Sequence, residues 1–137
     1  MIFGLMACLP AQAQEEVGQT PTDIKPYVKA SAVPAPKLLT PVDKVVDMRG
    51  KAFLRFQWQP QDNSCPVWYY ELHIYRGTEM SGATEISSKR TSERTTALLI
   101  PTDYFNDGEK YIWAVIQVSP GPLFSVPAIQ AFEARKH

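Results

Sequence analysis

Apolar and polar residues alternate over much of the chain beyond about residue 36. The clearest case is segment 52–58, which places Leu54, Phe56 and Trp58 on one face and Arg55 and Gln57 on the other. Successive side chains of a β-strand point to opposite faces of its sheet, so this pattern predicts a strand with one buried face.

Segment 67–76 alternates in the same way. One face carries Trp68, Tyr70, Leu72 and Ile74, and the other carries Tyr69, Glu71, His73 and Tyr75. The second set contains the polar members, so we expect the first set to lie in the core.

Five further runs predict strands. They are 37–41, 84–92, 95–101, 109–118 and 125–133. Residues 84–92 are polar and carry lysine and arginine, which favours an edge strand. Residues 109–118 are apolar on both faces, which favours a central strand, and Asn106-Asp107-Gly108 just before them predicts a turn. About seven short strands with no helical period predict an all-β, seven-stranded antiparallel β-sandwich.

The N-terminus differs in character from this domain. Residues 1–13 are apolar and end in Ala11-Gln12-Ala13, a pattern typical of a signal peptide cleavage site. An alternative is that the signal ends before Cys8, because Leu5-Met6-Ala7-Cys8 resembles a lipoprotein motif and would make Cys8 a lipidation site. Residues 14–35 are rich in proline and polar residues, so we predict a disordered, flexible tether before a domain at 36–137.

This processing has a consequence for the two cysteines. With Cys8 removed or lipidated, Cys65 has no partner in the chain, so we expect no intramolecular disulfide. Cys65 lies in a turn-like stretch, where we expect a lone, partly exposed thiol, and an intermolecular bridge is the alternative.

Composition narrows the function. The chain has 137 residues, 45% of them hydrophobic, and 14 basic residues balance 14 acidic ones. This length suits one ordinary domain with a hydrophobic core. A formal net charge of zero gives no field that would attract nucleic acid or an anionic membrane, so neither is expected as a partner except through a lipid anchor.

The domain from Pro36 to Phe132 resembles a fibronectin type III domain, an immunoglobulin-like sandwich. The resemblance rests on these features: the proline-rich start, Trp58 late in the second strand, Tyr69-Tyr70-Glu71-Leu72, Leu98-Leu99-Ile100-Pro101 and Tyr111-x-Trp113-x-Val115. It implies that Trp58 is the central core tryptophan and that Tyr111 forms a tyrosine corner, with its hydroxyl bonded to upstream backbone. Trp113 stands where family members have a smaller residue, which implies a reshaped core or a partly exposed indole. The structural core is expected to contain Phe56, Trp58, Tyr70, Leu72, Tyr111 and Trp113.

The sequence offers little chemistry. Its two histidines are His73 and the C-terminal His137, and no zinc, phosphate-loop or nucleotide motif occurs. Glu71 and His73 share a strand face, but we interpret the pair as a solvated surface contact. Asp103, Asp107 and Glu109 match no calcium loop, so we interpret them as solvated loop residues. We expect no catalysis, no metal site and no cofactor.

Binding is the expected activity. Candidate binding residues are Tyr69, His73, Tyr75 and Phe53, because aromatic side chains on a flat sheet suit protein contact or sugar stacking. The tyrosines also suit simple cross-strand packing. We predict a non-catalytic interaction or scaffold module, exported to the periplasm, outer membrane or surface of a bacterium, with a protein partner in a larger envelope assembly. The alternative is a carbohydrate- or peptidoglycan-binding module.

Overall fold

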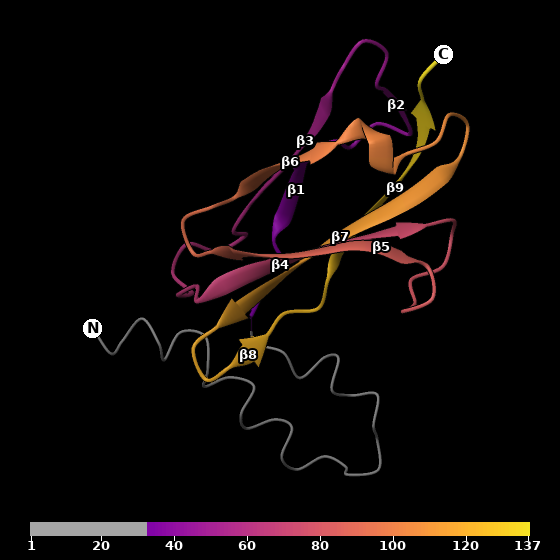
Figure 1. The fold of residues 1–137 in the computed structure, drawn as a ribbon. Helices are drawn as coiled ribbons and strands as arrows, with labels where there is room; N and C mark the ends of the chain where they lie inside the picture. Colours follow the sequence, from indigo (N-terminus) through magenta and orange to yellow (C-terminus); the bar gives the residue numbers. More distant parts are fainter. Residues whose placement is uncertain (1–32) are drawn as a thin grey trace.

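The structure, a computed structural model, describes residues 33–137 as a β-sandwich (Figure 1). Its elements are β1 (Lys37–Thr40), β2 (Val45–Asp47), β3 (Phe53–Gln59), β4 (Tyr69–Arg76), β5 (Glu85–Ser92), β6 (Ala97–Pro101), the 3-10 turn η1 (Thr102–Tyr104), β7 (Lys110–Ser119), β8 (Leu123–Phe124) and β9 (Ala128–Arg135). The smaller sheet has the order β1-β3-β6. The larger has the order β2-β9-β7-β4-β5, with β8 paired to β7.

The predicted sandwich is confirmed, with two refinements. The seven predicted strands correspond to β1, β3, β4, β5, β6, β7 and β9, and two short strands, β2 and β8, add to them. All strand pairs are antiparallel except β2 with β9, which is parallel. Among residues 33–137, no helix is long and apolar enough to cross a membrane.

Period-two burial builds both sheets. In β3, Leu54, Phe56 and Trp58 are buried while their neighbours are exposed or half-buried. In β4, buried and half-buried residues alternate from Tyr69 to Tyr75. Alternation therefore decides which half of each strand meets the other sheet.

Strand β7 is central, as its two apolar faces predict. It pairs with β4 on one side and β9 on the other. Its outward-facing Ala114, only 2% exposed, lies between His73 of β4 and Ile129 of β9 in the register. Neighbouring side chains on the same face thus cover the outer side of β7.

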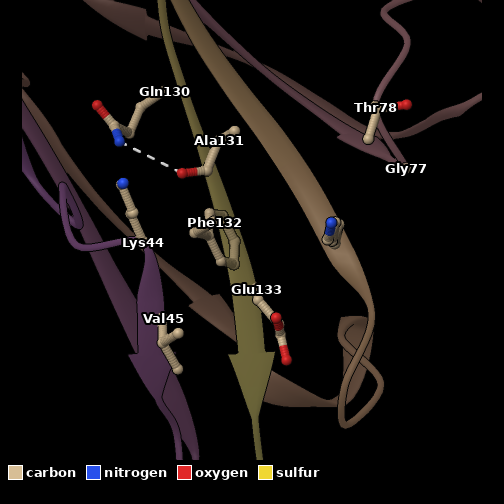
Figure 2. A pocket seen from close by; sticks show the side chains of 9 residues that line it. Lys44, Val45, Gly77, Thr78, Gln130, Ala131, Phe132 and Glu133 are labelled. Carbon is tan, nitrogen blue, oxygen red and sulfur yellow. Dashed lines mark hydrogen bonds between the residues drawn. The ribbon is translucent and has the colours of Figure 1, made fainter.

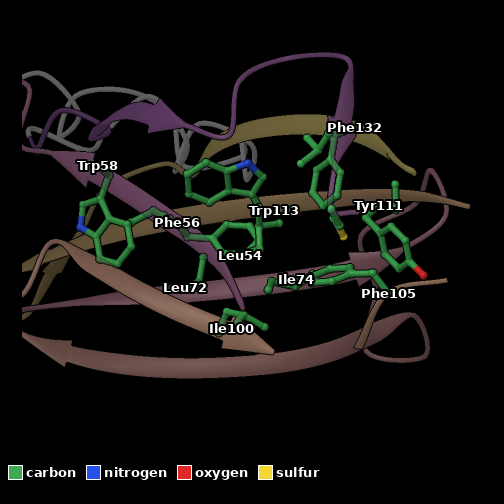
Figure 3. Close-up of a cluster of buried hydrophobic side chains, with 14 of the residues drawn as sticks. Leu54, Phe56, Trp58, Leu72, Ile74, Ile100, Phe105, Tyr111, Trp113 and Phe132 are labelled. Carbon is green, nitrogen blue, oxygen red and sulfur yellow. The ribbon is translucent and has the colours of Figure 1, made fainter. Parts of the chain in front are cut away.

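The core between the sheets is rich in aromatic rings (Figure 3). All six predicted core residues are buried: Phe56, Trp58, Tyr70, Leu72, Tyr111 and Trp113. The ring of Phe56 packs edge-on against Trp113, with centroids 4.9 Å apart. Tyr111 packs edge-on against Phe105 at the same distance. This layer is the dry interface that holds the two sheets together.

The tyrosine corner has the expected geometry. Gly108 adopts a φ of 80° in the turn before β7, a conformation that glycine reaches without strain. Three residues later the Tyr111 hydroxyl accepts a hydrogen bond of 2.7 Å from the backbone N–H of Asn106. The turn and the core are thus tied together by one buried ring.

The burial of Trp113 decides between the two expectations from the sequence, a reshaped core or a partly exposed indole. Its indole is fully buried, and its Nε1–H donates to the carbonyl of Pro41 at 3.0 Å. The core is therefore reshaped to hold the ring, and the segment after β1 supplies the acceptor.

The sequence prediction for Trp68 is wrong. This residue is 53% exposed, because β4 begins at Tyr69 and Trp68 precedes the regular alternation. Its backbone N–H donates to the carbonyl of Val118 at 2.7 Å, which anchors the chain while the indole points out of the core.

The prediction for Cys65 is also wrong. Cys65 is only 4% exposed and is disulfide-bonded, so it is neither a partly exposed loop cysteine nor a lone thiol. The prediction rests on the assumption that Cys8 is cleaved off or lipidated, and the second sulfur of the disulfide lies outside the described residues. The predicted signal peptide, the lipidation of Cys8 and the tether up to residue 32 also lie outside them.

Candidate binding face on the larger sheet

Three of the four predicted binding residues lie together. Tyr69, His73 and Tyr75 occupy the outer face of β4 and are half-buried, because they alternate with core residues. Phe53 is 53% exposed but lies on β3 of the smaller sheet, opposite Pro101 of β6. The structure therefore separates Phe53 from the other three.

His73 is held between two carboxylates on this face. Its Nδ1 lies 2.7 Å from Oε2 of Glu85 on β5, and its Nε2 lies 3.1 Å from Oε1 of Glu71. The side chains of His73, Glu71 and Glu85 are 18, 22 and 26% exposed. The Glu71–His73 pair is thus more shielded than the solvated contact predicted from the sequence, and it gains Glu85, which the sequence did not indicate.

This arrangement favours the charged imidazolium. Only the protonated ring carries an N–H on both nitrogens and can donate to both carboxylates. Burial alone would lower the pKa of His73, but the hydrogen bonds with Glu85 and Glu71 outweigh it, so the pKa is raised. The bond from His73 to Glu85 therefore links the edge strand β5 to β4, and the bond to Glu71 lies within β4; both are charge-assisted.

The surrounding side chains complete this network. Tyr75 stacks on His73, with ring centroids 6.2 Å apart and planes 20° apart. Burial, followed by the charges of Glu85 and Glu71, raises the pKa of the Tyr75 hydroxyl. Arg90 lies 3.6 Å from the second oxygen of Glu71. These polar side chains thus contact one another, as expected for residues that pack across strands. None of them is an activated nucleophile.

One end of the same face carries an aromatic cluster, by which we mean Trp68, Tyr69 and Arg90. The guanidinium carbon of Arg90 lies 4.0 Å from the centre of the Tyr69 ring, a cation–π contact. The rings of Trp68 and Tyr69 lie 5.3 Å apart, with planes inclined by 61°. Val118 of β7, the cross-strand neighbour of Tyr69, is fully buried. This cluster therefore presents a large exposed indole on a fixed base.

Sequence reasoning missed two of these three residues. Trp68 fitted the core face of an alternating run, and only the exact start of β4 turns it outward. Arg90 was recognised as part of a charged edge strand, but its place over Tyr69 depends on the β4–β5 register, in which Tyr69 pairs with Ser92 and Glu71 with Arg90. No local signal encodes that register.

A shallow groove lies at the other end of the larger sheet (Figure 2). Its lining residues are Lys44, Val45, Gly77, Thr78, Lys110, Gln130, Ala131, Phe132 and Glu133. Its walls mix two lysines with one carboxylate, and the amide of Gln130 is bonded to backbone carbonyls of Val42 and Ala131. This mixture favours no single class of ligand.

Metal binding finds no support in residues 33–137, where no group of three or more histidine, cysteine, aspartate or glutamate side chains could hold an ion. Asp107, near the predicted turn, instead accepts hydrogen bonds from the backbone N–H groups of Lys136 and His137. These bonds lower the pKa of Asp107. Its carboxylate therefore fastens the C-terminal end of the chain to the turn before β7.

Solved structures share this fold. A fibronectin(III)-like module of CbhA from Clostridium thermocellum is similar with a TM-score of 0.53 and 16% identity, over 74% of this chain and 97% of that one. A computationally redesigned β-sandwich protein is similar with a TM-score of 0.51 and 14% identity, over 74% and 87% of the two chains. No protein-family model and no curated protein matches the sequence.

These similarities establish the fold. The chain has a fibronectin type III-like fold, as its sequence resemblance implies. Domains of this kind are often binding or scaffold modules and are typically non-catalytic. Identities this low carry no partner or activity over to this chain, so its function has to be argued from its own side chains.

Proposed function

We propose that this chain is a non-catalytic interaction module that binds a protein partner through the aromatic cluster of Trp68, Tyr69 and Arg90. The observation that carries the proposal is the exposure of Trp68, an indole with 53% of its surface in solvent beside a guanidinium-capped tyrosine. Tryptophan, tyrosine and arginine are the residues that most often dominate the energy of protein interfaces.

The geometry favours a protein partner over a polysaccharide. A sugar ring stacks flat on an aromatic face, and an extended glycan would need neighbouring rings in nearly one plane. The rings of Trp68 and Tyr69 are inclined by 61°, and Arg90 covers one face of Tyr69. An inclined pair of rings with a charged rim suits an uneven protein surface better. Carbohydrate or peptidoglycan binding remains the second candidate because Trp68 alone could stack one sugar.

The proposed setting is the bacterial envelope. The predicted leader at 1–13 and the tether at 14–35 support export, followed by display of the domain on a flexible segment. A tethered module gains effective concentration near its anchor, which suits a member of a larger assembly. Mass spectrometry of the mature N-terminus tests this setting, since it should begin at Gln14 or at a lipidated Cys8, and retention of Met1 would contradict it.

The partner surface can be tested by site-specific photo-crosslinking in cells. A photoreactive residue at position 68 should yield a discrete crosslinked protein, and Arg90→Ala should weaken the crosslink. Phe53 provides a matched control, because it is equally exposed but lies on the opposite sheet. Equal crosslinking from positions 53 and 68 would contradict the proposal.

The glycan alternative has its own assay. The purified chain is sedimented with insoluble peptidoglycan or cellulose and compared with Trp68→Ala and Phe53→Ala. Retention that Trp68→Ala abolishes and Phe53→Ala preserves would favour the second candidate. Absence of retention, together with a specific crosslink from position 68, would support the protein partner.

A further inference from the structure

The open edges of the two sheets are built differently. Strand β5, at the edge of the larger sheet, carries Lys89 and Arg90, and charges of this kind discourage pairing with other strands. Strand β6, at the edge of the smaller sheet, has the sequence Ala-Leu-Leu-Ile-Pro and no charge (Figure 1). Among the described strands, β6 pairs only with β3.

The register shows which backbone groups of β6 are open. The N–H of Trp58 donates to the carbonyl of Thr96, and the N–H of Thr102 donates to the carbonyl of Ala52. Hydrogen-bonded pairs alternate along an antiparallel ladder, so the backbone N–H and C=O groups of the even-numbered residues 96–102 point toward β3. The N–H and C=O groups of Ala97 and Leu99 therefore point away from the sheet, and Pro101, which lacks an N–H, ends this row.

Some inward-facing side chains beside the edge are only partly covered. Leu98 of β6 and Ile86 of β5 both pack against the core cluster but are only partly buried. Lys89 pairs with Leu72 and so points to the inner side of the larger sheet, yet it is exposed. No ion pair within 4 Å involves Lys89 in the part of the chain described. The inner side of the two open edges thus carries two partly covered apolar side chains and one exposed cation.

We propose that β6 is a docking edge for an extended segment of a partner protein, which adds as an antiparallel strand and places a carboxylate toward Lys89. The backbone groups of Ala97 and Leu99 supply the hydrogen bonds of this strand addition. Alternate side chains of the added strand point inward, where apolar ones cover Leu98 and Ile86 and an acidic one meets Lys89. Lys89 sets the preference for an acidic segment, because a basic side chain at that point would be repelled.

A second copy of this chain fits the edge less well. Strands β5 and β6 are open edges of the two sheets, and Ile86 of β5 and Leu98 of β6 pack against the same core cluster. The β6 strand of a second copy has the sequence Ala-Leu-Leu-Ile-Pro and would therefore bring no carboxylate to Lys89.

The probe for this edge is an acetylated heptapeptide of alternating valine and threonine in which the central valine is replaced by glutamate. Its partner probe carries lysine at that position. Binding is measured by fluorescence anisotropy, and hydrogen exchange of the Ala97 and Leu99 amides reports the place of binding. We expect the glutamate peptide to bind about tenfold more tightly than the lysine peptide and to slow exchange at both amides.

Three variants of the full chain sharpen the test. Lys89→Glu should reverse the preference between the peptides, whereas Lys37→Glu on β1 should leave it unchanged. Ala97→Pro removes an outward N–H while keeping the bonds to β3, and should weaken binding about tenfold if melting shows an intact fold. Trp68→Ala should change nothing, so this edge can fail or succeed independently of the aromatic cluster.

Several outcomes would overturn the docking edge. One is the absence of peptide binding at millimolar concentration. Another is slowed exchange that maps to β5 or β2 and spares Ala97 and Leu99. A third is protection of those two amides that rises with protein concentration in the absence of peptide, which would assign the edge to a second copy.

Discussion

Two groups of polar atoms in the core differ in their hydrogen bonding. In the first group, the indole of Trp113 donates to Pro41 and the hydroxyl of Tyr111 accepts from Asn106. In the second group, Trp58 and Gln117 are equally buried, but within the described structure the indole Nε1 of Trp58 and both amide atoms of Gln117 have no hydrogen-bond partner.

The difference follows from the hydrogen-bonding groups that lie near each pair of residues. The segment after β1 and the turn before β7 place backbone groups beside Trp113 and Tyr111. Around Trp58 the neighbours are rings such as Tyr70, at a centroid distance of 5.8 Å. A buried polar group without a hydrogen-bond partner costs free energy, so packing alone must stabilise the core around Trp58 and Gln117.

Truncation of the two tryptophans should have the largest effect. Trp58→Ala should destabilise the fold by about 3–5 kcal/mol as a buried aromatic truncation. Trp113→Ala should cost about 1 kcal/mol or more beyond that, because it also leaves the Pro41 carbonyl without its donor. Urea denaturation monitored by circular dichroism gives both values, and a larger loss for Trp58→Ala would reverse the comparison.

Removal of the corner hydroxyl should have the next largest effect. Tyr111→Phe should cost about 1–3 kcal/mol, because it removes the acceptor of a partly buried hydrogen bond from the N–H of Asn106. Tyr70→Phe is the matched control, since no hydrogen bond of that hydroxyl is seen within residues 33–137. Equal melting curves for Tyr111→Phe and the parent would remove the energetic role of the corner.

The fold was largely predictable because period-two patterning is local. The faces of β3 and the central place of β7 follow from residue order alone, and the corner tyrosine follows from family resemblance. Trp68 marks where this reasoning stops: one residue of difference in the start of β4 moves an indole from the core to solvent.

The candidate site was predictable only in part. Tyr69, His73 and Tyr75 share a strand, so the pattern placed them on one face. The contacts of Glu85 with His73 and of Arg90 with Tyr69 come from the neighbouring strand and depend on register. The disulfide of Cys65 was missed because the sequence interpretation removed Cys8 or assigned it to lipidation.

The buried amide of Gln117, which has no hydrogen-bond partner within the described residues, offers an opportunity for stabilisation. Gln117→Met keeps a similar length while removing both unpartnered amide atoms, so it should stabilise the fold by about 1 kcal/mol. The backbone of Gln117 remains bonded to Ser125 in either case. Chemical denaturation measures the change. A loss of stability of similar size would show that the amide is satisfied in solution, for instance by buried water.

The smallest effect should come from the pH dependence of the network that His73 forms with Glu71 and Glu85. The hydrogen bonds with Glu85 and Glu71 raise the pKa of His73 against the effect of burial, so protonated His73 stabilises the folded state. That contribution is complete below the unfolded pKa of about 6.5 and is lost as pH rises through the higher folded pKa.

Solvent exposure limits the contribution of this network to stability. The three side chains are partly solvated, so we expect the contribution to be about 1 kcal/mol or less. His73→Gln cannot be charged and should flatten the fall in stability as the pH rises above about 6.5, while the control His137→Gln should keep the parent profile. Melting temperatures across this range provide the measurement. Parallel profiles for His73→Gln and the parent would contradict this prediction. They would mean that the neutral ring of His73 stabilises the fold as much as the protonated ring does, so that its two hydrogen bonds add no pH-dependent free energy of unfolding.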